Sequence, residues 1–157
     1  MVIRKLRGGR RWGAVAVETA LVMIGMTSFV FGVFEYGRLV MDWNLLNNAA
    51  REGCRYALVH NTDSTIQADV QTRVTNFMGG QTSSFTNSTV TATVSGTYES
   101  GPQQGVSTQQ VNTLAAGDLI TVTVSGSYQF MNIIPLIQMP SSFPITTSVT
   151  MVCEGAM

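Results

Sequence analysis

The chain has 157 residues, enough for one domain with a modest core. Its formal net charge is zero, but charged residues make up only 11% of it and Lys5 is its single lysine. Such a composition is untypical of a cytosolic enzyme or a disordered tail. Ser and Thr are frequent after residue 60, as expected for an exported domain rich in strands.

The zero net charge hides an asymmetry at the N-terminus. Residues 1–13 contain five basic residues and no acid, and the rest of the chain carries all nine acids with four arginines. Basic residues beside a membrane segment stay on the cytoplasmic side, so residues 1–13 predict a cytoplasmic leader. Contact with nucleic acid or lipid headgroups is the weaker alternative, and no nucleic-acid partner is expected.

An apolar run over residues 14–34 follows the leader and contains one charge, Glu18. A helix over this run is about 31 Å long, which matches the hydrocarbon core of a bilayer. A removable secretory signal has a shorter apolar core and a cleavage site after it, whereas Glu35-Tyr36-Gly37-Arg38 follows here. We therefore predict a membrane span at 14–34 and an extracytoplasmic domain at 35–157, in a compartment that permits disulfides.

Glu18 is costly in hydrocarbon, so its partner has to be named. One interpretation is that it lies one turn into the span and reaches the headgroups. The other is that a cut between Gly13 and Ala14 frees an ammonium group with which Glu18 pairs, in its own or a neighbouring chain. Glu18, Gly25 and Gly32 are spaced by seven on one stripe, where small residues let helices approach closely. The general frequency of glycine in membrane helices is the alternative explanation.

Helical periodicity continues beyond the membrane. Apolar residues recur with helical spacing at Trp43, Leu46, Ala50, Cys54 and Ala57. We therefore predict one helix from about residue 14 to about residue 59, either straight or kinked near its glycines.

Glu35 and Arg38 lie one helical turn apart, at the outer end of the predicted span. They predict a surface ion pair worth roughly a few tenths of a kcal/mol. A contact between subunits at the outer face of the membrane is the alternative.

A second helix and three strands are expected after the first helix. Ser64 and Gln67 have the spacing of a capping box, and the helix of about 13 residues behind them has apolar positions at Ile66, Val70, Val74 and Phe77. Alternating residues predict strands at 89–95, 119–125 and 145–153.

Two connections between these elements stand out. Residues 100–117 are rich in Gly, Gln and Ser and predict a long exposed loop. Residues 130–144 are apolar but contain prolines that exclude a regular central strand. We expect this second connection to pack on the core, with a position near the bilayer surface as the alternative.

The two cysteines lie far apart in sequence but both on apolar faces. Cys54 belongs to the apolar stripe of the long helix, and Cys153 to the apolar side of the last strand. If that strand packs on that helix, the sulfurs meet, and we hypothesise a disulfide; two free thiols are the alternative. On the loop-entropy model the bond contributes about 4–5 kcal/mol.

The elements together define an α+β fold in which the long N-terminal helix, membrane-spanning in its first half, packs on a small antiparallel sheet. The sequence contains no Ser/His/Asp, Cys/His, metal-ligand or paired-carboxylate constellation. We therefore expect no enzyme activity, cofactor, metal or small-molecule substrate. The acids after Glu35, among them Asp42 and Asp118, are expected at caps, turns and the surface.

Three stretches carry a family resemblance: Gly13-Ala-Val-Ala-Val-Glu18 with the apolar run behind it, Phe34-Glu35-Tyr36-Gly37-Arg38, and Ala49-Ala-Arg-Glu-Gly-Cys-Arg-Tyr-Ala57. Over about residues 10–60 the chain resembles the TadE-like proteins. These are pseudopilin components of the tight-adherence (Tad) secretion and pilus system of bacteria and archaea. The resemblance implies a pilin-like fold and an inner-membrane protein with its N-terminus in the cytoplasm.

The resemblance also implies a mode of action. A prepilin-type membrane peptidase would cut between Gly13 and Ala14, and Glu18 would be the acid typical of prepilins. With other pilins or pseudopilins as partners, the mature chain would then either be assembled into a Tad pilus, a fibre for adhesion, or help to start one.

Two features depart from the family. Cys54 stands where the family usually has Ala, and Thr19 follows Glu18 where the major pilin has a Glu-Tyr pair. The missing pair and the length of the chain favour an accessory subunit over the major pilin. An uncleaved, membrane-anchored scaffold or binding module, with residues 100–117 as its surface, is the alternative.

Overall fold

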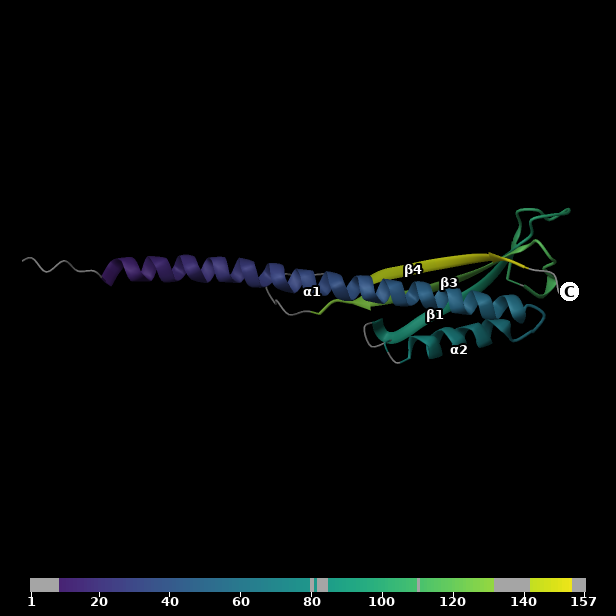
Figure 1. Cartoon of the computed structure of the whole chain (residues 1–157), viewed down its shortest axis with the longest axis horizontal. Helices are drawn as coiled ribbons and strands as arrows, with labels where there is room; N and C mark the ends of the chain where they lie inside the picture. The colour runs from purple at the N-terminus through teal and green to yellow at the C-terminus, as the bar shows by residue number, and fades with distance from the viewer. Residues whose placement is uncertain (1–8, 80, 82–84, 110, 132–141, 154–157) are drawn as a thin grey trace, which may run out of the picture.

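A computed structural model describes residues 9–157 except 80, 82–84, 110, 132–141 and 154–157. It shows a long N-terminal helix, α1 (Gly9–Val59), whose first half stands clear of a small domain (Figure 1). The second half of α1 packs in that domain with a second helix, α2 (Ile66–Met78), and an antiparallel sheet. The predicted α+β fold is confirmed.

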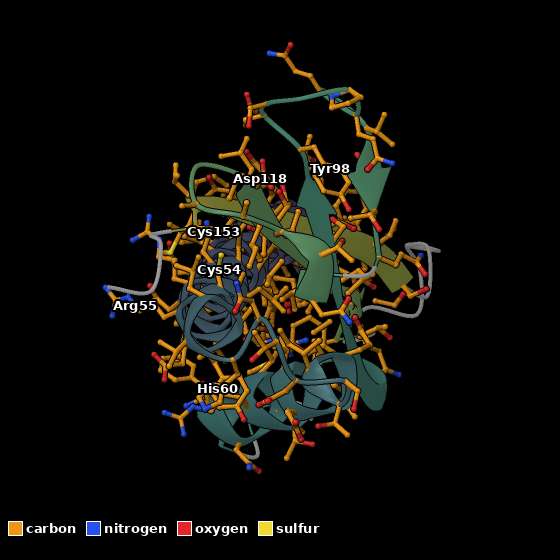
Figure 2. The ribbon with its side chains drawn as sticks, turned by 90° about the vertical axis from the view of Figure 1, so that its right-hand side faces the viewer. Cys54, Arg55, His60, Tyr98, Asp118 and Cys153 are labelled. Atoms are coloured by element: carbon orange, nitrogen blue, oxygen red, sulfur yellow. The ribbon has the colours of Figure 1, made fainter. Side chains whose placement is uncertain are left out.

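The sheet contains the three predicted strands and one short addition. Its order is β2-β1-β3-β4, with every neighbouring pair antiparallel. The strands are β1 (Phe85–Thr97), β2 (Ser107–Thr108), β3 (Leu119–Gln129) and β4 (Ser142–Val152). Both helices cover the same face of the sheet (Figure 2). The opposite face carries the alternating Thr and Ser residues of the strands, as the sequence predicts.

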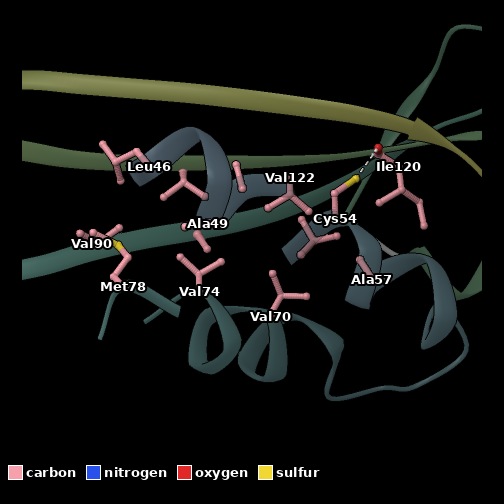
Figure 3. Packing of buried hydrophobic residues seen from close by; sticks show 14 of the residues in the cluster. Leu46, Ala49, Cys54, Ala57, Val70, Val74, Met78, Val90, Ile120 and Val122 are labelled. Atoms are coloured by element: carbon pink, nitrogen blue, oxygen red, sulfur yellow. Dashed lines mark hydrogen bonds between the residues drawn. The ribbon is translucent and has the colours of Figure 1, made fainter. Parts of the chain in front are cut away.

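The predicted continuity of α1 is confirmed, since the helix passes Gly32 and Gly37 without interruption. Four residues of its predicted apolar stripe are fully buried: Leu46, Ala50, Cys54 and Ala57. Figure 3 shows Leu46, Cys54 and Ala57 between α2 and the sheet. Trp43, the first residue of that stripe, is 48% exposed. The prediction for Trp43 is therefore wrong, because the buried face of α1 at this level passes through Asp42 and Leu46, with Leu39 packed against the core one turn earlier, and Trp43 lies beside that face.

The second helix agrees with its predicted bounds but not with its predicted cap. α2 ends at Gly79, which adopts the left-handed conformation at φ 54° that glycine tolerates best. Its N-cap residue, Thr65, makes no side-chain capping bond, so the predicted capping box is wrong. Phe77 is 47% exposed, and Met78 takes the buried position expected of it.

Gln67 fails to cap the helix because it binds the sheet instead. Its amide donates to the Ala92 carbonyl at 2.6 Å and accepts from the Val94 amide at 2.9 Å. One turn later, Gln71 donates to the Val90 carbonyl at 2.7 Å and accepts from the Ala92 amide at 2.6 Å. The two glutamines thus hydrogen-bond β1 as a neighbouring strand would, which closes this edge of the sheet and fixes α2 to it.

The predicted loop at 100–117 is only partly a loop. It includes β2 and a short 3-10 helix, η2 (Val111–Thr113), and Val111 is buried. Asp118 at its end is 3% exposed and accepts hydrogen bonds from the amides of Glu99 at 3.0 Å and Ala115 at 2.8 Å. Asp118 therefore takes the turn position expected of the acids in this part of the chain, and its second bond ties that turn to the segment after β1.

The second unusual connection, 130–144, lies mostly outside the described residues. Its last part, from Ser142, already belongs to β4. Pro144 is tolerated there because β4 is an edge strand, where an amide that faces away from β3 is not needed for pairing.

Candidate functional site

The candidate site is the exposed half of α1 together with its junction to the domain. The helix is long and apolar enough to cross a membrane, and its most apolar stretch has no residue buried in the domain. Large side chains along this stretch are open to their surroundings, with Leu21 and Phe29 both 73% exposed. In water such a surface is unfavourable, whereas in lipid it is required. The structure therefore fits anchoring by a single membrane pass.

Glu18 lies on this exposed half, and no described residue is paired with it. Gly25 and Gly32 share its stripe, and a Cβ atom added to either glycine would meet nothing within 4 Å. Gly13, at the predicted cleavage bond to Ala14, is equally open. The stripe is thus accessible to a neighbouring helix. The proposed cleavage and assembly roles of these residues stay predictions.

At the outer end of this segment, α1 is tied to the last residues of β3 by a group that we call the clasp: Glu35, Arg38 and Tyr128. The Arg38 Nε donates to the Tyr128 hydroxyl at 2.8 Å, and that hydroxyl donates to Glu35 Oε1 at 2.9 Å. Arg38 and Glu35 are 3.4 Å apart. The Arg38 guanidinium also lies 5.0 Å from the centre of the Tyr128 ring.

Backbone groups complete the clasp. Arg38 donates a second bond to the Gln129 carbonyl at 2.5 Å, and the Met131 amide donates to Glu35 Oε1 at 3.2 Å. The predicted Glu35–Arg38 ion pair within α1 is confirmed, but both of its residues also bind the end of β3, so it is not simply a surface pair. Sequence reasoning missed Tyr128 because it lies 90 residues from Arg38. The one available signal was the Phe34–Arg38 motif of the family resemblance.

The clasp keeps the Tyr128 phenol neutral. Burial and the hydrogen bond to the Glu35 carboxylate raise the pKa of Tyr128 to about 12, against a smaller opposite effect of Arg38. An ionised phenolate could not donate to Glu35, so the clasp requires the protonated form.

We predict that the outer domain loses stability between pH 10 and 12. In this range the unfolded Tyr128 releases its proton and the folded one retains it, so the free energy of unfolding falls by at most about 3 kcal/mol as the pH rises. Tyr128→Phe is expected to show a shallower fall, and Tyr36→Phe, which changes an exposed tyrosine, the same fall as the unmodified chain. Chemical denaturation at a series of pH values measures this, and equal slopes for both variants would contradict it.

The two cysteines lie near one another in the domain, as the predicted packing of the last strand on α1 requires (Figure 2), and Cys153 acts electrostatically on the Cys54 thiol. Both are buried free thiols, and Cys54 Sγ donates to the Ile120 carbonyl at 3.5 Å (Figure 3). Burial raises the pKa of Cys54 to about 11 and also raises that of Cys153, where the Asp118 charge adds to the effect. Since thiolates are the reactive form, a bond between them would form during folding and not afterwards. The disulfide stays a prediction.

We predict that the full chain isolated from its native compartment is two hydrogens lighter before reduction than after it. A reducing agent should then lower the free energy of unfolding by up to about 4–5 kcal/mol. Intact-protein mass spectrometry with alkylation of free thiols measures the first effect, and Cys54→Ala provides the unbonded control. Quantitative alkylation of both cysteines without reduction would contradict the bond.

The fold and the exposed helix define a class: α+β proteins whose N-terminal helix is long and apolar enough to cross a membrane, the one such helix among the described residues. Within it, a family model described as "TadE-like protein" matches residues 13–55, which covers the exposed half of α1, the clasp residues of α1 and most of the buried stripe. The resemblance is thereby confirmed over this segment, and it indicates a Tad pilus-associated protein. Neither a curated protein nor a solved structure matches the chain.

Proposed function

We propose that the chain is an accessory, pseudopilin-like subunit of a Tad pilus that assembles through α1 after a prepilin-type peptidase has cut between Gly13 and Ala14. The observation that carries this proposal is the division of α1. One uninterrupted helix has a bare apolar half with Glu18 on it and a second half whose stripe is buried in a folded domain.

This geometry suits transfer from a membrane to a fibre. The bare half can exchange lipid for neighbouring helices at little cost, because both surroundings are apolar. The buried half and the clasp keep the outer domain in a fixed position on the helix during that exchange. The leader places the N-terminus in the cytoplasm and the domain outside the inner membrane. The partners are then the membrane, other pilins or pseudopilins and the peptidase.

Glu18 gives the assembly its register. A carboxylate in an apolar medium needs a cationic partner, and no described residue of this chain supplies one. Removal of residues 1–13 would create an ammonium group at Ala14, one turn from Glu18. In a bundle of helices the same pairing can join adjacent subunits. The proposed role is structural and not enzymatic.

The proposal is tested at the N-terminus of the protein. The full chain is produced with and without a prepilin-type peptidase, and the mature N-terminus is determined by mass spectrometry. We expect a chain that begins at Ala14 only when the peptidase is active, and an uncut chain for Gly13→Leu. Retention of residues 1–13 in functional protein would support the uncleaved scaffold or binding module instead.

A further inference from the structure

We propose that the membrane-facing end of the outer domain is seated in the outer headgroup layer of the bilayer, so that lipid contacts the domain as well as α1. We call this end the base and define it by four exposed residues: Tyr36 and Trp43 on α1, Met131 after β3 and Phe143 on β4. The proposal rests on the membrane anchoring of α1 in the proposed function, and it adds a second contact with the same phospholipid bilayer.

The spacing of the charges sets the position of the bilayer along α1. Arg38 comes twenty positions after Glu18, a separation of about 30 Å along a helix, which is the thickness of the hydrocarbon core. Charged groups are least costly at the two boundaries of that core. We therefore place Glu18, before assembly, at the inner boundary and the clasp at the outer one, where Glu35 directly follows Phe34 and Arg38 lies one turn further on.

The clasp then holds the end of the sheet at the same level. Arg38 binds the Gln129 carbonyl and Glu35 binds the Met131 amide, so the end of β3 cannot lie far above the lipid. Phe143 pairs with Tyr128 across the β3–β4 ladder and lies in the same end of the sheet. Figure 1 shows the near ends of β3 and β4 beside α1 just beyond its bare half.

The side chains at this level suit an interface between lipid and water. Tyr36 is 68% exposed, Met131 62%, Trp43 48% and Phe143 47%. Tyrosine and tryptophan are the residues that concentrate at headgroup level, because their rings are apolar and their polar groups reach water. An aqueous surface gains nothing from four such side chains, whereas a headgroup layer does.

The charged residues near the base are also neutralised or buried, as a medium of low polarity requires. Glu35 and Arg38 neutralise each other within the clasp, and Asp42, the next charged residue of α1, is only 4% exposed. The described part of α1 then carries no further charge until Arg51. Partner proteins can cover apolar residues too, but the continuity of the base with the membrane-crossing half of α1 favours lipid.

Depth-dependent fluorescence quenching tests the proposal on the full chain. The chain carries Trp12→Phe, so that Trp43 is its single tryptophan, and is reconstituted at one copy per nanodisc. The lipids carry a quencher at the headgroup, high on the acyl chain or near the bilayer centre. We expect headgroup-labelled lipid to quench Trp43 at least twofold. Met131→Trp and Phe143→Trp, each in a background with Trp43→Phe, should behave in the same way.

Two control positions calibrate the depth in that background. Phe29→Trp, within the predicted span, should be quenched most strongly by lipid labelled near the centre. Val106→Trp, exposed at the far end of the domain, should be unaffected. If Phe29→Trp is quenched but the three base positions resemble Val106→Trp, the base stands clear of lipid and this inference is wrong while the anchor holds. If Phe29→Trp is not quenched, the anchor and the proposed function fail with it. If the base residues are shielded from water only when several copies share one disc, a protein partner covers the base, and the inference is also overturned.

Discussion

Gly53→Leu is expected to destabilise the outer domain by about 3 kcal/mol or more, a large part of the stability of a small domain. Gly53 lies where α1 crosses α2 and β3. A Cβ atom there would be 2.9 Å from Val74 Cγ2, 3.2 Å from Val70 Cγ1 and 3.4 Å from Val122 Cγ1. Valine side chains adapt poorly because their χ1 angles are restricted. A leucine would therefore push both helices and the sheet apart.

The matched control for this prediction is the same substitution on the same helix. At Gly37 a Cβ atom would meet nothing within 4 Å, and leucine is a better helix former than glycine. Gly37→Leu should leave the free energy of unfolding unchanged or raise it by up to about 1 kcal/mol. Denaturation of the outer domain in nanodiscs, followed by Trp43 fluorescence, compares the two. Similar effects of both substitutions would show that close packing at Gly53 does not limit stability.

Gly53 also illustrates how much of the fold the sequence could predict. The spacing of Leu46, Ala50 and Cys54 identifies a buried face because burial repeats with the period of the helix. Alternation identifies the strands in the same way. Both signals are local, so they say which face is buried and not what covers it. The need for glycine at position 53 depends on Val74 and Val122, which only the folded chain brings there.

The wrong or incomplete predictions have the same physical origin, since local sequence does not show a side chain's distant partner. Gln67 has the spacing of a capping residue, but its side-chain amide instead forms two hydrogen bonds with the edge of β1. Asp118 binds the nearby Ala115 amide, as a turn acid is expected to, but its burial and its bond to the Glu99 amide were not expected. For Gln67, and for the second bond of Asp118, a backbone group distant in sequence supplies the partner.

The residues of the candidate site also differ in whether the sequence alone could identify them. Glu18 could be singled out from sequence because a charge inside an apolar run is conspicuous without any structure. The clasp could not, because the importance of Arg38 depends on Tyr128 and on two backbone groups after it. Among the residues that the structure describes, none is paired with Glu18, which agrees with the proposal that its partner is created by cleavage or provided by another subunit.

Glu18→Ala is therefore the substitution expected to affect function most while leaving the fold intact. No described residue is paired with Glu18, so the stability of the outer domain should not change. If Glu18 pairs with the Ala14 ammonium in an apolar bundle, its removal leaves a charge without a partner, at a cost of about 3–5 kcal/mol. A cost of this size would reduce the number of pili per cell at least tenfold.

Two further variants separate charge from size and position. Glu18→Gln retains the volume and the hydrogen-bonding groups but not the charge, and we expect it to be as defective as Glu18→Ala. Glu52→Ala removes another acid of α1, which is paired with Arg73 at 2.7 Å on the domain surface, and it should leave piliation unchanged. Pilus counts by electron microscopy, with immunoblots for the amount and length of the chain, measure all three. If Glu18→Gln forms pili normally, the carboxylate has no ionic partner during assembly, and the helices must then find their register by packing at Gly25 and Gly32 alone.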